Sequence, residues 1–264
     1  MSHASDDPQA PLLQVRDLDK LYGTVVACRD VSFDLWPGEV LAVVGESGSG
    51  KTTLLRCLSG LLPPDRGQVL YATRHDGVRD VLNMSEPERR FLMRTDWGFV
   101  HQSPREGLRM GVSAGANVGE RLMATGARHY GDIRHQAADW LARVEIDVAR
   151  IDHRPDTFSG GMQQRLQIAR NLVTGPRLVF MDEPTGGLDV SVQARLLDLM
   201  RGLVGDLGLS AIVVTHDLAV ARLLSHRMLV MRAGEIVESG LTDQILDDPQ
   251  HPYSQLLVAS ILQP

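Results

Sequence analysis

Three short apolar runs along the chain predict buried strands of one parallel sheet. They cover residues 40–44, 178–182 and 211–215, and each holds at least four consecutive apolar side chains. Continuous apolar runs of this length are typical of strands covered on both faces. Residues 53–58 and the segment after Ser159 instead show the spacing of helices that are apolar on one side. The alternation of strands and helices predicts an α/β fold with a doubly wound core.

The rest of the chain adds antiparallel strands. Residues 31–35 alternate apolar and polar side chains, which favours an antiparallel strand with one exposed face. Residues 228–231 and 235–238 flank an Ala-Gly turn and predict a closing hairpin. Ser85 stands three residues before Glu88, which is the spacing of a capping box, so we expect a short helix to start there.

The pattern predicts one nucleotide-binding unit with an insertion. Residues 1–10 are polar and predict a mobile N-terminal tail, and residues 11–264 form the domain. The stretch 103–155 is polar, rich in helix patterns and poor in strand patterns. With the helix after it, this stretch predicts a helical subdomain at approximately 103–170.

The turn after residues 40–44 fits the phosphate-binding pattern G-x-x-x-x-G-K-[ST]. Its candidate nucleotide-binding residues are Gly45, Glu46, Ser47, Gly48, Ser49, Gly50, Lys51, Thr52 and Thr53. A strand, a glycine loop and a helix in this order let backbone N–H groups converge on phosphate oxygens. Lys51 then offers a cation to the β- and γ-phosphates, and Thr52 offers a hydroxyl to Mg²⁺. The loop predicts binding of a nucleoside triphosphate with Mg²⁺.

A second anion-binding turn occurs at Ser159, Gly160 and Gly161. Ser159 is a good N-cap for the following helix, whose first N–H groups face any bound anion. One nucleotide needs only one phosphate loop, so the second turn indicates a composite site. The run Ser-Gly-Gly-x-Gln, which ends at Gln163, resembles the signature of the ATP-binding-cassette (ABC) ATPases.

The resemblance implies a fold, two cofactors and a partner. The fold is the ABC nucleotide-binding domain, with a parallel-sheet core, an antiparallel β subdomain and an inserted helical subdomain. The cofactors are ATP and Mg²⁺. In this family the signature of one subunit closes on the nucleotide held by the loop of another. We therefore expect ATP hydrolysis at a dimer interface, with an identical copy or a related ATPase as the second subunit.

The resemblance also assigns catalytic roles. Asp182 and Glu183 follow an apolar strand. Asp182 is expected to help bind Mg²⁺, largely through water, and Glu183 to deprotonate the attacking water. His216 matches the histidine that contacts the γ-phosphate, and Gln102 matches the glutamine that links Mg²⁺ and water to a mobile helical region.

Two further positions match the family. Tyr22 corresponds to the aromatic residue that stacks on adenine, and Asp189 to the loop that contacts the opposite subunit. The chain departs from the usual pattern in having Phe158 and Met162 around Ser-Gly-Gly, and Gly186-Gly187 where Ser-Ala is common. No catalytic position is lost, but the glycine pair widens the accessible backbone conformations near Asp189.

Composition narrows the setting. The net charge of −6 over 264 residues argues against a nucleic-acid partner. No apolar run approaches the ~20 residues of a membrane span, so we expect a cytoplasmic protein with no direct membrane insertion. The two cysteines, Cys28 and Cys57, lack metal-ligand spacing, and Cys57 is expected to be a buried thiol.

The segments between the motifs resemble one subfamily, the ATP-binding subunits of the bacterial phosphonate carbon–phosphorus lyase system. The most specific segment is 119–134, which no site chemistry requires and which we interpret as a partner-binding surface. The resemblance implies docking on the lyase core complex, including its radical-chemistry iron–sulfur subunit. There the ATPase would drive a conformational change during phosphonate breakdown.

Two alternatives stay open. Residues 248–257 also resemble the ATPase subunits of peptide and nickel importers. Those subunits usually carry a further extension, whereas this sequence stops at Pro264, which favours the lyase system. A scaffold that binds ATP without hydrolysis is the third hypothesis, and the presence of Glu183 and His216 argues against it.

Overall fold

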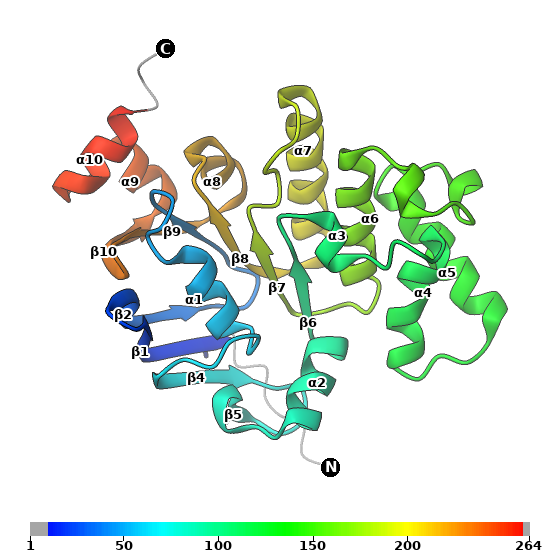
Figure 1. The fold of residues 1–264 in the computed structure, drawn as a ribbon, viewed down its shortest axis with the longest axis horizontal. Coiled ribbons are helices and arrows are strands. Elements are labelled where there is room, and N and C mark those ends of the chain that lie inside the picture. Colours follow the sequence, from blue (N-terminus) through cyan, green and yellow to red (C-terminus); the bar gives the residue numbers. More distant parts are fainter. Residues whose placement is uncertain (1–9, 261–264) are drawn as a thin grey trace. The chain divides into compact units, whose positions relative to one another are not determined.

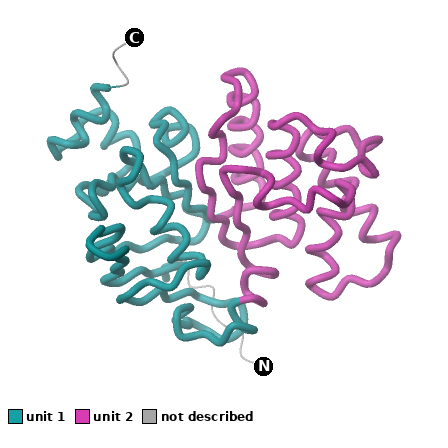
Figure 2. The backbone as a smooth tube through the Cα atoms, viewed as in Figure 1, with its two compact units in different colours: residues 1–89, 210–264 teal, residues 90–209 magenta. Residues whose placement is uncertain are grey.

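The computed structural model describes residues 10–260, which form a mixed α/β fold (Figure 1). The predicted tail, residues 1–10, lies outside the described residues except for Ala10. The chain forms two compact units, one of residues 1–89 with 210–264 and one of residues 90–209 (Figure 2). We call them the first and the second unit.

The first unit contains an antiparallel sheet with the order β2-β1-β4-β5. Its strands are β1 (Leu13–Tyr22), β2 (Val25–Leu35), β4 (Arg66–Ala72) and β5 (Val78–Asp80). Alternate side chains of β1 such as Leu13 and Val15 are fully buried, as expected for a strand with one covered face. The strand predicted at 31–35 is confirmed as the end of β2. The other strands of this sheet were not predicted.

The second sheet of this unit surrounds the strand before the phosphate loop. β3 (Val40–Val44) pairs in parallel with β8 (Ser210–Thr215) and β9 (Arg227–Arg232). β10 (Glu235–Leu241) pairs antiparallel with β9. The predicted hairpin is therefore confirmed, and its first strand extends the parallel sheet. Fully buried side chains along β3 and β8 explain their continuous apolar sequences.

The helices of the first unit include α1 (Lys51–Leu58), α8 (Leu218–Leu224), α9 (Thr242–Asp247) and α10 (Pro252–Ala259). A short 3₁₀ turn, η1 (Val81–Asn83), precedes α2 (Glu86–Thr95). The backbone N–H of Ser85 donates to Glu88 Oε2 at 2.8 Å, and the Ser85 hydroxyl donates to the same oxygen at 2.6 Å. The predicted helix therefore starts here, with one of the two hydrogen bonds of the predicted capping box.

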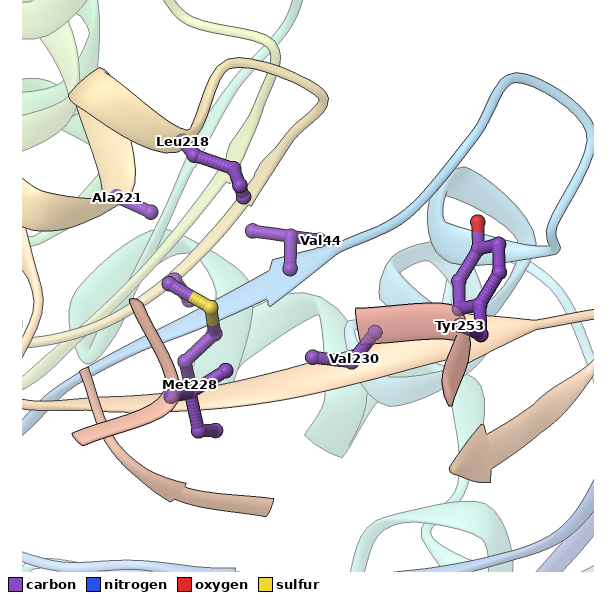
Figure 3. Packing of buried hydrophobic residues seen from close by; sticks show 8 residues of the cluster. Val44, Leu218, Ala221, Met228, Val230 and Tyr253 are labelled. Atoms are coloured by element: carbon purple, nitrogen blue, oxygen red, sulfur yellow. The ribbon is translucent and has the colours of Figure 1, made fainter. Parts of the chain in front are cut away.

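The C-terminal helices of the first unit pack into the same core as β3. Figure 3 shows Val44 of β3 and Val230 of β9 with Leu218 of α8 and Tyr253 of α10. Ile245 of α9 belongs to the same buried cluster. Burying these side chains together stabilises the segment after β10 against the sheet, at roughly 1.5–3 kcal/mol for each large apolar side chain.

The second unit is built from a parallel strand pair and a set of helices. β6 (Trp97–Val100) pairs with β7 (Leu178–Asp182), with Val100 opposite Met181. Its helices are α3 (Pro104–Gly107), α4 (Ala114–Ala124), α5 (Tyr130–Arg143), α6 (Gly160–Leu172) and α7 (Val190–Leu207), with 3₁₀ turns η2 (Val148–Arg150) and η3 (Pro155–Thr157). The strand at 178–182 is confirmed, and β6 was not predicted. A separate subdomain at 103–170 stays a prediction.

Candidate nucleotide-binding site

The loop between β3 and α1 has a backbone that only glycine accommodates at two points. Gly45 has φ 151° and Gly50 has φ 105°. A Cβ atom at Gly45 would overlap the carbonyl oxygen of Met231, and one at Gly50 would overlap that of Ala27. The loop is therefore pressed against β9 on one side and β2 on the other, and its glycines are needed for close backbone approach.

Hydrogen bonds within this loop hold Lys51 in place. Lys51 is buried, and its Nζ donates to the carbonyl oxygens of Gly45 and Glu46, each at 2.8 Å. The N–H of Gly234, in the β9–β10 turn, donates to the carbonyl of Ser49 at 3.0 Å. The Oγ of Ser49 is buried with no hydrogen-bond partner among residues 10–260. The loop is thus already ordered, with a cation and an unsatisfied hydroxyl inside it.

The remaining loop residues have graded exposure. Ser47 and Gly48 are exposed, whereas Thr52 and Thr53 are half-buried in the first turn of α1. The N–H of Leu54 donates to the carbonyl of Gly50 at 2.8 Å, so α1 is regular from its first turn. The N-terminal end of α1, which carries a partial positive charge, therefore lies directly at the end of the loop.

His216 and the phosphate loop follow neighbouring strands. Val44 pairs with Thr215 in the parallel register of β3 and β8, so Gly45 and His216 come directly after paired residues. His216 is exposed, and Asp217 next to it caps α8 by accepting the N–H of Ala219 at 2.8 Å. The sheet places both predicted site residues at the same edge.

Tyr22 lies at the end of β1, in the first unit. Its side chain is half exposed at 51%. The Nζ of Lys20 lies 5.7 Å from the centroid of its ring, within reach of a cation–π contact. An exposed aromatic face of this kind is available to a flat partner such as a nucleobase.

In the second unit, the two predicted carboxylates follow β7. Asp182 is the last residue of the strand and is buried. Glu183 adopts φ 47°, the left-handed region that non-glycine residues rarely occupy, and its carbonyl accepts the N–H of Gly186 at 2.9 Å. Such a conformation costs about 1–3 kcal/mol and persists only where the surroundings impose it. The turn closed by the Gly186 N–H therefore imposes this backbone conformation on Glu183.

Gln102 lies beside the turn at Glu183. It follows β6, the parallel neighbour of β7, and it is exposed. A Cβ atom at Gly186 would lie 3.2 Å from both the Nε2 of Gln102 and the carbonyl oxygen of Glu183. The second unit therefore brings Gln102 and Glu183 together, as the parallel strand pair requires.

The turn before α6 has an N-cap as predicted. The Oγ of Ser159 accepts the N–H of Met162 at 3.3 Å. Ser159 and Gly160 are exposed, but Gly161 is buried against α7, where a Cβ atom would overlap Val192. Leu188, in the loop before Asp189, lies 3.6 Å from the position of a Cβ atom at Gly160.

Gln163 and Asp189 have different surroundings. Gln163 is buried, and its Nε2 donates to the carbonyls of Pro155 and Phe158 at 2.8 and 3.1 Å. It therefore supports the backbone before Ser159 from inside the unit, and a contact with nucleotide stays a prediction. Asp189 is exposed at the start of α7, and its carbonyl accepts the N–H of Val192 at 2.9 Å.

Sequence reasoning missed a pairing of α6 with β6. Gln167 Oε1 accepts the N–H of His101 at 2.7 Å, and its Nε2 donates to the carbonyl of the same residue at 3.1 Å. Asn171 Oδ1 accepts the N–H of Phe99 at 3.0 Å. Both amides are buried. The only signal was two amide side chains one turn apart on a helix whose neighbouring positions are apolar.

Both cysteines are free and buried. Burial raises the pKa of Cys57 to about 11 and that of Cys28 to about 12. Both thiols therefore stay protonated at neutral pH, which confirms the prediction for Cys57.

The comparison with protein families matches the geometry. The model described as ABC transporter matches residues 28–186, more than half of the chain. The chain therefore belongs to the ABC transporter family and is an ABC-type ATPase domain, homologous to cassettes that hydrolyse ATP. This confirms the fold and the ATPase activity predicted from the motifs. Among residues 10–260, none of the helices has both the length and the apolar character that a membrane span requires.

Two curated relatives differ in the process for which they are named. The chain is 66% identical to the putative phosphonates utilization ATP-binding protein PhnK of Escherichia coli K12, over 96% of this chain and 98% of that protein. It is 38% identical to the dipeptide transport ATP-binding protein DppF of the same organism, over 96% of this chain and 77% of DppF.

Solved structures agree on the fold. The ATP-binding cassette MJ0796, described as a dimer in a post-hydrolysis state bound to ADP and Pi, has a TM-score of 0.78 and 29% identity. The comparison covers 87% of this chain and 98% of that cassette.

Proposed function

We propose that this chain is the ATP-hydrolysing subunit that docks on the carbon–phosphorus lyase core complex and drives its conformational change during phosphonate breakdown. The observation that carries this proposal is the 66% identity, over nearly the full length of both chains, to a protein named for phosphonate utilization. The identity to the dipeptide transport protein DppF is 38%. We place the activity in the cytoplasm, where ATP is supplied.

Nucleotide binding is assigned to the first unit. Lys51 and the N–H groups at the start of α1 hold the phosphates, and Tyr22 stacks on adenine. For Mg²⁺ we propose the hydroxyl of Thr52, the carboxylate of Asp182 and the amide oxygen of Gln102. Hard oxygen donors of this kind fit Mg²⁺, which when bound neutralises charge on the phosphates.

Hydrolysis is assigned to Glu183 and His216. Glu183 accepts a proton from the attacking water, and His216 donates a hydrogen bond toward the γ-phosphate. Gln102, which lies beside the Glu183 turn, orients the water. The left-handed backbone at Glu183 supports this role, because strained residues of this kind cluster at functional sites.

We propose that a second copy of the chain completes the site. Ser159 and Gly160 are exposed at the start of α6, so their N–H groups are open to an anion from outside the protomer. The dimeric state of the MJ0796 cassette supports this arrangement. Two copies would close over two ATP molecules, and hydrolysis would release them.

The Glu183→Gln variant tests this scheme. We expect turnover to fall by about 10²–10⁴-fold, the usual contribution of a general base, while ATP binding is kept and a dimer accumulates. Asp198→Asn, at an exposed carboxylate of α7, is the control. Phosphate release and light scattering measure the two effects. Normal turnover in Glu183→Gln would contradict the assignment, and no phosphate release from the assembled wild-type complex would favour a scaffold.

The proposed docking surface is the segment 119–134. It covers the end of α4, the following loop and the start of α5. Met123 is 47% exposed and Tyr130 is 72% exposed within it. Exposed apolar side chains in a segment without site chemistry are suited to a protein partner, here the lyase core with its iron–sulfur subunit.

Co-purification tests the docking. We expect the wild-type chain to bind the soluble lyase core, and a Met123→Ala/Tyr130→Ala variant to bind it at least tenfold more weakly. Phe91→Ala is a matched control, because Phe91 is 64% exposed outside the segment. Equal binding by both variants would show that the docking surface does not lie in residues 119–134.

The second candidate function is the energy subunit of a peptide importer. It is supported by the 38% identity to DppF and by the resemblance of residues 248–257. Co-purification with a membrane permease, in place of the soluble lyase core, would establish this alternative.

A further inference from the structure

The phosphate loop is contacted by a tyrosine from the C-terminal helix. The hydroxyl oxygen of Tyr253 accepts the backbone N–H of Glu46 at 3.0 Å. The two residues are 207 positions apart in sequence, and both belong to the first unit. Tyr253 is 4% exposed, so its ring cannot leave this position without exposing apolar surface.

Contacts on several sides hold the Tyr253 ring. It packs in the cluster with Val44 and Val230, as Figure 3 shows, with its hydroxyl at the edge of the group. The guanidinium carbon of Arg232 lies 5.0 Å from the ring centroid, a cation–π distance. The backbone N–H of Tyr253 donates to Nδ1 of His251, the N-cap of α10, at 3.1 Å.

The turn before α10 is fixed in the same way. Glu238 of β10 accepts the N–H groups of Gln250 and His251 at 2.9 and 3.0 Å. Strand β10 therefore fixes the position at which α10 begins. The position of α10 in turn places the Tyr253 hydroxyl next to the N–H of Glu46. Charge-assisted hydrogen bonds to a carboxylate are stronger than neutral ones, so this attachment is firm.

The peptide groups around Glu46 are consequently held from opposite ends. Its N–H is bonded by Tyr253, and its carbonyl accepts Lys51 Nζ at 2.8 Å and the N–H of Ser49 at 3.2 Å. Of these partners of Glu46, Tyr253 is the one that comes from the C-terminal helix α10. Removing its hydroxyl would free the first peptide of the loop, and binding would then have to restore that order.

We propose that Tyr253 is a positioning residue for nucleotide binding, which holds the phosphate loop in its binding conformation through the N–H of Glu46. The inference rests on the proposed assignment of residues 45–53 as the phosphate loop. Coupling is reciprocal, so bound nucleotide also stabilises the C-terminal helix through the same bond. The segment 248–257 would then have the same role in the ATPase whether the protein acts with the lyase core or with a peptide importer.

The test compares three variants of the full chain by equilibrium binding of ATP and of ADP. Tyr253→Phe keeps the ring and removes the hydroxyl, and we expect both affinities to fall about 3- to 10-fold, as for one lost hydrogen bond. The two factors should be equal, because the loop contacts phosphate that ATP and ADP share. Tyr71→Phe removes the hydroxyl of a fully buried tyrosine of the antiparallel sheet, and it should leave both affinities unchanged.

Lys51→Ala separates the inference from its premise. If Lys51→Ala loses affinity and Tyr253→Phe does not, the role of Tyr253 is overturned and the phosphate loop stands. If Lys51→Ala binds ATP like the wild type, the loop assignment itself fails. Equal weakening in Tyr253→Phe and Tyr71→Phe would also overturn the proposal, because it would reflect a general loss of packing.

Hydrogen exchange gives a second readout. We expect saturating ADP to slow amide exchange in residues 252–259 of the wild type, and to do so less in Tyr253→Phe. Identical protection of α10 in both proteins would contradict the reciprocal coupling.

Discussion

The phosphate loop and the start of α6 both place glycines at the N-terminal end of a helix, but the two segments differ in how many contacts hold them. Around the loop, Gly45 and Gly50 press against neighbouring strands, and the carbonyl of Glu46 is bonded by Lys51. At α6, Ser159 and Gly160 are exposed, and the cap is a single 3.3 Å hydrogen bond. Of the two turns proposed to bind anions, the first is hydrogen-bonded on several sides within its unit, whereas the second begins with two exposed residues.

The difference has a physical meaning for a composite site. A loop that is ordered before binding costs little entropy when phosphate arrives, so it can select the nucleotide first. In the proposed dimer, the exposed start of α6 meets nucleotide when the partner protomer brings it. This contrast supports the proposed order, in which each protomer binds ATP and then closes on its partner.

The largest expected effect is on the ordered loop. Lys51→Ala removes the cation and its bonds to Gly45 and Glu46, and we expect ATP affinity to fall about 10- to 100-fold. Equilibrium binding measures it, with Arg29→Ala, in an exposed ion pair of the same unit, as control. Unchanged ATP affinity in Lys51→Ala would show that the loop, although ordered, does not bind the nucleotide.

The next largest effect is a loss of stability when the hydrogen bonds between α6 and His101 are removed. Gln167→Leu removes the acceptor of the His101 N–H and one of the two side-chain donors to the His101 carbonyl, to which Gln164 Nε2 also donates at 3.3 Å. We expect the free energy of unfolding to fall by about 1–3 kcal/mol. Denaturant unfolding measures it. Gln136→Leu makes the same change at an exposed position of α5. Similar losses in both variants would mean that α6 is not anchored through Gln167.

A matched pair of serines sharpens the comparison further. Ser159 and Ser113 each cap a helix of the second unit, with bonds of 3.3 and 3.2 Å. Each Ser→Ala change should cost about 1 kcal/mol of stability. Only Ser159→Ala should weaken ATP-dependent dimer formation, by about tenfold, in analytical ultracentrifugation. Equal dimerisation of the two variants would argue that the open end of α6 never meets nucleotide.

The smallest expected effect is pH-dependent and tests the attachment of α10. Burial disfavours the charged form of Glu238, but hydrogen bonds, including those from Gln250 and His251, outweigh burial and lower its pKa below the usual 4.5. Its folded pKa is lower than its unfolded pKa, so the carboxylate stabilises the fold above about pH 4.5 and loses this contribution as pH falls.

Glu238→Gln should therefore cost under about 1 kcal/mol at pH 7. The difference from wild type should shrink as the pH falls from 7 to below 4.5. Denaturant unfolding across this range measures it, and Glu235→Gln on the same strand controls for the lost charge. A constant difference across the range would assign the effect to packing.

Much of the architecture could be predicted because the order of residues within short segments determines it. Continuous apolar runs predicted β3, β7 and β8, and the Ala-Gly turn predicted the hairpin of β9 and β10. The four-residue β6 and the strands β4 and β5 escaped, because short or mixed sequences become strands only when a neighbour supplies hydrogen bonds.

The candidate site likewise contains features that could be predicted from the sequence and features that could not. Loop residues 45–53 and the cap at Ser159 could be predicted because each feature spans a few consecutive residues. The left-handed backbone of Glu183 could not, because the surrounding turn imposes it against the preference of the residue. Gln163 was expected at the nucleotide, and the structure uses its amide to hold the carbonyls of Pro155 and Phe158.

The sequence by itself determined the family, the phosphate loop and the strands that flank it, because glycine, apolar runs and capping residues act through their immediate neighbours. Only the tertiary structure decided that Tyr253 contacts Glu46 across 207 positions and that Gln167 pairs with His101. Contacts between distant segments depend on which surfaces the core brings together, and burial of apolar side chains sets that without leaving a local pattern.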